Sequence, residues 1–228
     1  MTLDFDPSDD LAKVADGTET VTLLRRGATP GSPGTVLSGV LRGPAATAEP
    51  IVGNRHEVRR RADTHGKLLA HDLVWHLPAD QLDEPPRPGD VVLDGSGGRW
   101  TILEAESVTL QTRWRANTRN LAVAHGLDDT VTILKATYAK GTGGAAEPTW
   151  HTWRAGVRAR IQAQGASMDT EHRSRRTAAR YRIFVDEDLP LDHTHRVQGP
   201  DGTSYRILGT SGAERLGEPQ TIEAEVVS

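Results

Sequence analysis

One short pattern occurs twice in this sequence, and it limits what the chain can fold into. Residues 89–103 contain an apolar position, a turn rich in Asp and Gly, an aromatic residue and then Ile-Leu, and residues 193–208 repeat that order. Alternating apolar residues around such a turn are typical of a tight β-hairpin. At a constant offset the two copies match Val92 with Val197, Trp100 with Tyr205, Ile102 with Ile207, and Leu103 with Leu208.

A second repeated stretch supports the same division. Residues 20–24 read Thr-Val-Thr-Leu-Leu, and residues 130–134 read Thr-Val-Thr-Ile-Leu. A chain of 228 residues can form one large β domain or two domains of about 110 residues. The repeats favour two domains, residues 1–123 and 129–228, joined by a short linker at residues 124–128.

Most of the chain has the pattern of short strands. In the first unit we expect strands at 20–25, 36–42, around 73–77, in the hairpin and at 108–115, with Val108, Leu110, Thr112 and Trp114 on one face. The expected counterparts in the second unit include 153–161, 180–185 and 221–227. In the first of these, Gly156-Val157 matches Gly39-Val40. The predicted fold class is therefore mainly β, with two tandem small antiparallel barrels or sandwiches.

A short helix is expected before the first strand. Asp6 and Pro7 form an N-cap and first-turn pair, and Gly17 ends the segment, which predicts a helix over residues 7–15.

Composition excludes several functions. Acidic and basic residues are interspersed and sum to a net charge of −4, which argues against a dedicated nucleic-acid binder. The chain has no Cys, so it has neither disulfides nor thiolate chemistry, which fits a reducing cytoplasm. No segment resembles a signal peptide or approaches the roughly 18 apolar residues of a membrane span, so we expect cytoplasmic synthesis and no membrane partner.

No catalytic motif is recognisable, so we expect no enzyme activity, no cofactor and no metal. A nucleophile elbow, a phosphate loop with Lys-Ser or Lys-Thr, and a paired-His motif are absent. The run Gly95-Ser96-Gly97-Gly98 resembles a phosphate cradle, but it lies between two strands with no helix after it, so we interpret it as a turn.

Two polar clusters have a functional and a structural interpretation. Asp192, His193 and His195 have the residue types of a zinc site, but we favour solvated histidines at a strand edge. The acidic run at residues 186–188 offers paired carboxylates for acid catalysis. We place it in an exposed turn, where carboxyl pKa values shift little.

Five Trp residues are candidates for core packing or for stacking on bases or sugars. Trp75, Trp100 and Trp114 fall on the apolar side of predicted strands, so we assign them to the core. Trp150 and Trp153 flank a loop, and the sequence does not assign them to either role.

Each unit has one basic run, which lies just before its central strand. A polar segment at residues 44–66 contains the first run, and we interpret it as a long excursion or a β-arm. The arms are either solvated or contact the acidic surface of a partner or the DNA backbone. The candidate contact residues are Arg55, Arg59, Arg60 and Arg61 in the first arm, and Arg173, Arg175 and Arg176 in the second.

The second unit resembles the phage head-tail joining proteins, which are also called adaptor, stopper or head-closure proteins. The resemblance spans most of residues 129–228, and the first unit repeats it more loosely. It rests on the order of Trp153–Val157, the basic arm, residues 180–185, the hairpin from Arg196-Val197 to residues 205–208, and Ala213-Glu214-Arg215 before a final strand.

The resemblance implies a structural protein of the virion neck, a small β-barrel that forms a homo-oligomeric ring between portal and tail. Its implied partners are further copies of itself, the portal protein, tail or tail-terminator proteins and, non-specifically, the packaged DNA. This chain departs from the family by carrying two units. The alternative is a tandem small-barrel protein that binds single-stranded nucleic acid through Trp and Arg residues.

Overall fold

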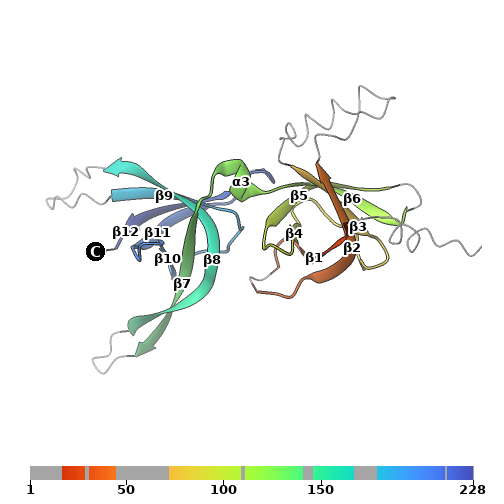
Figure 1. Ribbon diagram of the computed structural model, residues 1–228. Coiled ribbons are helices and arrows are strands. Elements are labelled where there is room, and N and C mark those ends of the chain that lie inside the picture. The colour runs from red at the N-terminus through yellow and green to blue at the C-terminus, as the bar shows by residue number, and fades with distance from the viewer. Residues whose placement is uncertain are drawn as a thin grey trace, which may run out of the picture. The chain divides into compact units, whose positions relative to one another are not determined.

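The computed structural model describes residues 17–28, 31–44, 72–108, 111–140, 146–166, 179–213 and 215–227. These residues form two closed, antiparallel β-barrels in tandem (Figure 1), which confirms the predicted fold class. The chain divides into a first unit, Met1–Ala124 with Arg215–Gly217, and a second unit, His125–Glu214 with Glu218–Ser228. The helix expected at residues 7–15 lies outside the described residues.

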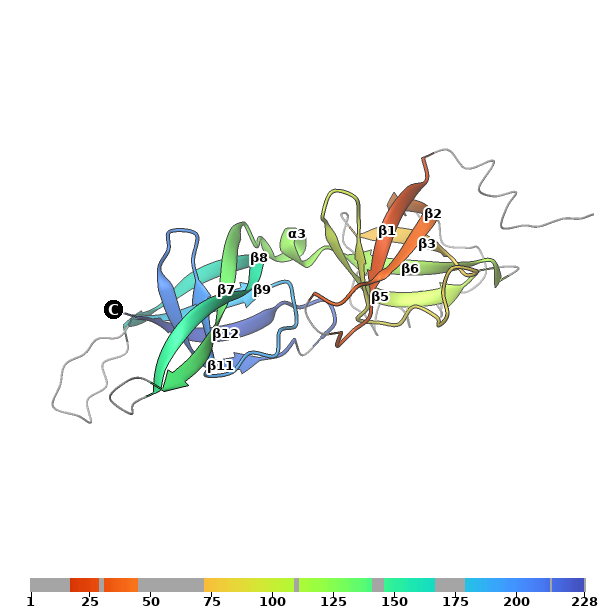
Figure 2. The same ribbon diagram turned by 90° about the horizontal axis from the view of Figure 1, so that it is seen from below.

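The first barrel is built from two three-stranded meanders. The first strands of the two meanders, β1 and β4, pair with each other (Figure 1), and so do their last strands, β3 and β6 (Figure 2). Around the barrel, the strands are β1 (Glu19–Leu24), β2 (Thr35–Pro44), β3 (Leu73–Pro78), β6 (Arg113–Arg119), β5 (Arg99–Ser107) and β4 (Val91–Leu93).

The second barrel repeats this circuit strand for strand. Its hairpin β10–β11 takes the place of β4–β5, so the repeat in the sequence is also a repeat in the structure. Around the barrel, the strands are β7 (Asp129–Lys140), β8 (Ala146–Ala166), β9 (Ala179–Val185), β12 (Gln220–Val226), β11 (Ser204–Ser211) and β10 (His195–Gln198).

A glycine bends the second strand of each barrel. Gly39 and Gly156 have φ angles of 66° and 75°, a left-handed conformation that glycine adopts at little cost. The following residues, Val40 and Val157, are fully buried. The predicted match of Gly39-Val40 with Gly156-Val157 is nevertheless wrong in register, because Val157 pairs with Val131, whose counterpart Val21 pairs with Leu37.

A short helix, α3 (Leu121–His125), reaches into the predicted linker. Asn120 caps it, because its Oδ1 accepts a hydrogen bond from the Val123 amide at 3.2 Å, and Leu121 is buried. Among the described residues, no helix has the length and apolar character needed to cross a bilayer.

The predicted strand at residues 108–115 is wrong. β5 continues to Ser107 and β6 begins at Arg113, and between them the Gln111 amide donates to the Val108 carbonyl at 2.9 Å, with Gln111 at a φ of 54°. This turn lacks the Gly or Pro that marks most turns. The alternation of apolar residues therefore predicts a continuous strand where the chain in fact turns. The buried residues of β6 are Arg113, Ala116 and Thr118.

Each barrel has its own apolar core. The first surrounds Trp75, which is fully buried and meets the ring of Trp100 edge-on with centroids 6.1 Å apart, while Trp114 packs against the same cluster. The core assignment of these three Trp residues is therefore confirmed. The second core contains Val131, Ile133, Val157, Ile183, Val197, Tyr205 and Ile222, among others.

Replacement of Trp75 by Ala should destabilise the first barrel strongly. Removing a fully buried indole leaves a cavity that the closed barrel cannot collapse, so we expect the free energy of unfolding to fall by about 3 to 5 kcal/mol. Urea denaturation monitored by circular dichroism measures this, with the exposed Val36→Ala as the control. An unchanged denaturation midpoint for Trp75→Ala would contradict the assigned core.

Candidate functional site

The predicted contact residues of the two arms all lie outside the described residues. Arg55, Arg59, Arg60 and Arg61 fall between β2 and β3, and Arg173, Arg175 and Arg176 fall between β8 and β9. These two connections are the same link in the two barrel circuits. The arms therefore leave equivalent corners of the barrels, and their contacts with a partner stay a prediction.

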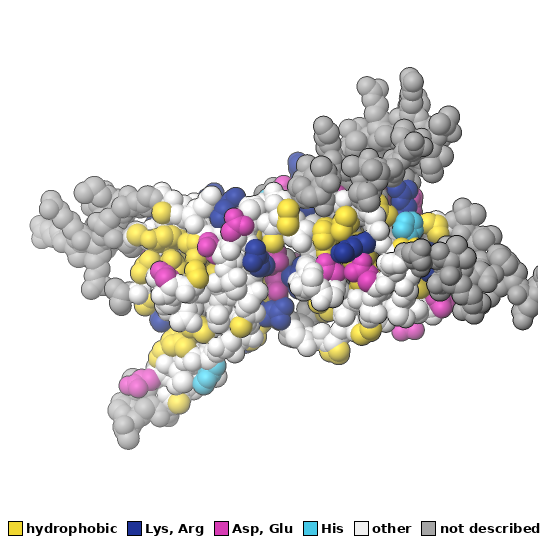
Figure 3. Space-filling view, in the orientation of Figure 1, with side chains coloured by type: hydrophobic (Ala, Val, Ile, Leu, Met, Phe, Trp, Pro, Cys, Tyr) yellow, Lys and Arg dark blue, Asp and Glu magenta, His cyan; other side chains and the backbone are white. Residues whose placement is uncertain are grey.

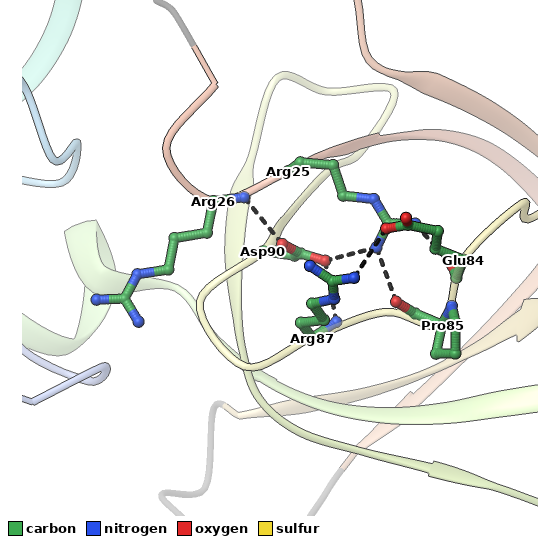
Figure 4. Close-up of polar contacts among 6 residues, drawn as sticks. All are labelled: Arg25, Arg26, Glu84, Pro85, Arg87 and Asp90. Atoms are coloured by element: carbon green, nitrogen blue, oxygen red, sulfur yellow. Dashed lines mark hydrogen bonds and ion pairs between the residues drawn. The ribbon is translucent and has the colours of Figure 1, made fainter.

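A buried carboxylate organises one end of the first barrel. Asp90, 1% exposed, lies directly before β4. Its Oδ1 accepts from the Arg26 amide at 2.8 Å, and its Oδ2 accepts from the Arg87 amide and from Arg25 Nη1, both at 2.9 Å (Figure 4). Charge-assisted bonds of this kind are among the stronger hydrogen bonds in proteins. Both oxygens of Asp90 are thus occupied by donors of the protein itself.

The same network ties down the loop before β4. Arg25 also donates to the carbonyls of Glu84 and Pro85, at 2.7 and 2.8 Å, and Arg87 pairs with Glu84 at 2.9 Å (Figure 4). Because Arg25 follows β1 directly, this network continues the short β1–β4 seam beyond its last paired residues. Its role is to hold the barrel closed.

In the second barrel, a buried histidine lies at the position that corresponds to Asp90. His195, 4% exposed, occupies the position of Asp90, and its Nδ1 lies 2.8 Å from Asp192 Oδ1. Trp153 covers its ring edge-on, with centroids 4.9 Å apart. Thr194 donates to Asp192 through its amide, and its carbonyl accepts from the Ala136 amide at 2.8 Å. The expectation of a solvated histidine is therefore wrong for His195, although His193 is exposed.

This arrangement does not assemble a metal centre. Asp192 Oδ1 also accepts from the Thr194 hydroxyl, and these bonds, first from Thr194 and then from His195, hold the pKa of Asp192 well below its ordinary value. In the described part of the chain, no three His, Cys, Asp or Glu side chains are placed to hold a metal ion.

The glycine-rich run is a turn, as predicted. Asp94 Oδ1 accepts from the amides of Ser96 and Gly98, at 2.9 and 2.7 Å, and Oδ2 accepts from the Trp100 indole at 2.8 Å. Burial alone would raise the pKa of Asp94. The hydrogen bonds from Ser96, Trp100 and Gly98 outweigh burial and lower the pKa. The amides that would cradle a phosphate are directed at this carboxylate.

The acidic run is only partly the exposed turn that we expected. Asp188 is exposed, but Asp186 and Glu187 are buried. Arg154 of β8 holds Glu187 through two hydrogen bonds of 2.8 and 3.1 Å, and this pairing raises the pKa of Arg154. The sequence offered no sign of the pair, because the two residues are far apart in the chain.

The two Trp residues left open differ in their surroundings. Trp153 packs against the second core and His195, whereas Trp150 lies under the guanidinium of Arg196, whose Cζ is 4.0 Å from the ring centroid. A stacked arginine occupies one face of Trp150, which leaves less of the ring for a base or sugar.

The two positions of a buried ion pair in the first barrel carry residues of reversed charge in the second barrel. Arg119 binds Asp72 through two hydrogen bonds, at 3.0 and 2.8 Å, on neighbouring strands. The matching positions carry Glu225 and Arg180, which are partners in the β12–β9 register, and Glu225 pairs with Arg206 instead. On the surface, acidic and basic side chains lie side by side (Figure 3).

Comparison with solved structures gives a similarity over part of the chain. A chain described as "Virion of native gene transfer agent (GTA) particle" resembles this chain with a TM-score of 0.34 and 17% sequence identity. The similar region covers 43% of this chain and 93% of that chain. No protein-family model matches the sequence, and no curated protein matches it.

Removal of the Asp90 charge should weaken the first barrel. Asp90→Asn leaves Arg25 without its counter-ion and turns an amide NH₂ toward backbone donors, so we expect a loss of about 2 to 4 kcal/mol in the free energy of unfolding. Urea denaturation measures the loss. The control is the exposed Glu84→Gln, for which we expect a change within about 0.5 kcal/mol. Equal effects of the two substitutions would contradict the role assigned to the Asp90 carboxylate.

The lowered pKa of Asp94 predicts a dependence of stability on pH. A carboxyl whose pKa is lower in the folded state stabilises the protein above its unfolded value of about 3.9, and this contribution is lost as pH falls through the folded value. Asp94→Asn should therefore cost about 1 to 2 kcal/mol at neutral pH, and the difference from the native chain should shrink below about pH 4. Urea titrations at pH 7 and pH 3 test this, and a difference that grows on acidification would contradict it.

Proposed function

We propose that this protein is a structural connector of a phage or phage-derived particle, and that it forms a homo-oligomeric ring between portal and tail around the DNA channel. The observation that carries the proposal is the tandem of two identical barrel circuits, each with an Arg-rich segment at the same corner, in a chain whose second unit resembles head-tail joining proteins. A repeated module that carries an Arg-rich segment twice suits an assembly built by repetition.

The polar residues inside the barrels support a structural role. The buried Asp90 and His195 take part in closing their barrels, and Glu187 is neutralised by Arg154. The carboxylates of Asp90 and Glu187 and the Nδ1 atom of His195 are engaged with groups of the protein itself. We accordingly propose a protein without enzyme activity, which acts in the virion neck after synthesis in the host cytoplasm.

The surface charges suit a channel that DNA slides through. On the described strands, basic side chains lie beside acidic ones, as in the ion pairs of Arg42 with Glu19 and of Arg182 with Glu223. Each pair neutralises part of the positive charge that would otherwise hold DNA in place. Contacts to DNA or to an acidic portal rim then depend on the arms, where Arg59–Arg61 and Arg173–Arg176 concentrate positive charge.

The alternative function, binding of single-stranded nucleic acid by aromatic stacking, has less support. Trp75 is fully buried, Trp100 and Trp114 pack against the same core, and Trp150 carries a stacked arginine. Stacking on bases requires exposed ring faces.

Electron microscopy of the purified protein, alone and mixed with the portal protein of the same particle, tests the proposal. We expect rings that cap the portal. We also expect Arg175→Glu with Arg176→Glu to weaken portal or DNA binding by about tenfold or more, because it reverses two charges of the second arm. The matched control is Arg26→Glu with Arg158→Glu, which changes two exposed arginines outside the arms. A protein that remains monomeric and ignores the portal would overturn the proposal.

A further inference from the structure

One end of the second barrel carries two carboxylates beside two tyrosines. Asp129 begins β7, and its Oδ2 accepts a hydrogen bond from the Ile161 amide at 3.2 Å. Asp201 lies in the turn between β10 and β11. Tyr205 of β11 meets Tyr181 of β9 edge-on, with ring centroids 5.1 Å apart. We call these five residues the Tyr205 cluster.

The two carboxylates act on the same tyrosine hydroxyl. A Cβ atom at Gly199 would lie 3.0 Å from Asp201 Oδ1, 3.3 Å from the Tyr205 ring and 3.6 Å from Ile161. Burial raises the pKa of Tyr205, and the charges of Asp201 and Asp129 raise it further. Tyr205 is 6% exposed, and its hydroxyl is bonded to no residue of the described part of the chain.

The first barrel holds an arginine at the matching place. Its two carboxylates are Glu19, the first residue of β1, and Asp94, whose turn has the same backbone bonds as the turn at Gly199. Arg42 of β2 lies beside both, with its Nε 3.0 Å from Glu19 Oε1 and its Nη1 4.0 Å from Asp94 Oδ2. Its Cζ is 5.9 Å from the centroid of the Trp75 ring. Two carboxylates and an aromatic ring thus hold a guanidinium.

The second barrel keeps the carboxylates and lacks the arginine. Arg42 pairs with Trp75 across β2 and β3, and the same place in β8 and β9 pairs Ile161 with Ile183. The register on the other side agrees, because Arg42 and Ile161 each lie two residues after the partner of the first residue of β1 or β7. Among the described residues, no Lys or Arg forms an ion pair with either carboxylate of the Tyr205 cluster.

We propose that the Tyr205 cluster binds the guanidinium of an arginine presented by a partner protein. Asp129 and Asp201 supply the negative charge, and the two tyrosine rings supply an aromatic surface. Ile161 adds an apolar contact for the stem of the incoming arginine. Thr203 donates one hydrogen bond to each oxygen of Asp201, at 3.0 and 2.7 Å, which leaves further lone pairs on both oxygens.

Charge complementarity selects a protein as the occupant. Asp201 is exposed and Asp129 is half-buried, so solvent reaches both carboxylates. Their charges repel the phosphates of a nucleic acid, whereas a guanidinium pairs with carboxylates and also stacks on aromatic rings. The site requires neither a ring nor a portal, so it can succeed or fail independently of the connector proposal.

Titration with acetyl-arginine amide, followed by NMR of protein with labelled tyrosines, tests the site. The chain has three Tyr, and Tyr138, which is 56% exposed on β7, is the internal control. We expect the Tyr181 and Tyr205 signals to shift with a Kd of roughly 1 to 10 mM. Acetyl-citrulline amide, which is uncharged and similar in shape, should bind about tenfold more weakly. No shift, equal shifts of all three tyrosines, or equal binding of the two compounds would overturn the proposal.

Three variants separate charge from packing. Ile161→Arg places a tethered guanidinium where Arg42 lies in the first barrel, so it should abolish the response, whereas the apolar control Ile161→Met should bind like the native chain. Asp129→Asn removes one charge at nearly constant size and should weaken binding about threefold. Circular dichroism checks that each variant is folded. Loss of binding in Ile161→Met, or native binding in Asp129→Asn, would contradict the proposal.

The arginines of the chain's own second arm are the rival occupant. Arg173, Arg175 and Arg176 lie between β8, which carries Ile161, and β9, which carries Tyr181. Replacing all three by Gln should leave the response to acetyl-arginine amide unchanged if the site serves a partner. A response that appears only in this triple variant would assign the site to the chain's own arm and would overturn the assignment to a partner protein.

Discussion

Each barrel depends on a short seam where its first strand meets its fourth. β1 and β4 share three paired residues, and β7 and β10 share four. Without these pairs, each sheet would end in two open edges, and core residues such as Val92 and Val197 would lose their cover. A seam this short requires reinforcement, and in both barrels it comes from the loop just before the closing strand.

The two barrels reinforce the seam with different chemistry. In the first, the Asp90 carboxylate binds Arg25 and the amide of Arg26. In the second, the amide of Ala136, which matches that of Arg26, is satisfied by the Thr194 carbonyl, while His195 fills the buried position against Asp192 and Trp153. The backbone requirement is the same in each case. A buried donor must be paired, but the group that pairs it is free to change.

This division between a fixed circuit and variable polar groups bears on function. The positions of Asp72 and Arg119 form a buried ion pair in the first barrel, and the matching positions carry opposite charges in the second. The hairpin of β7 and β8 continues past the pairing of β7 with β10, and the described residues of the first barrel show no such extension. The two units thus share an architecture and present different surfaces, as expected if one contacts a different partner from the other.

The sequence by itself determined the repeated hairpin, the two barrels, the core Trp residues and the Asp94 turn. These features depend on apolar alternation and on turn residues that are neighbours in the sequence. The sequence pattern wrongly predicted one strand over residues 108–115, because the turn at Gln111 lacks the residues that usually mark a turn. The burial of His195 and the pairing of Glu187 with Arg154 were decided only by tertiary structure. Each joins residues that lie far apart in the chain, and barrel closure is what fixes both.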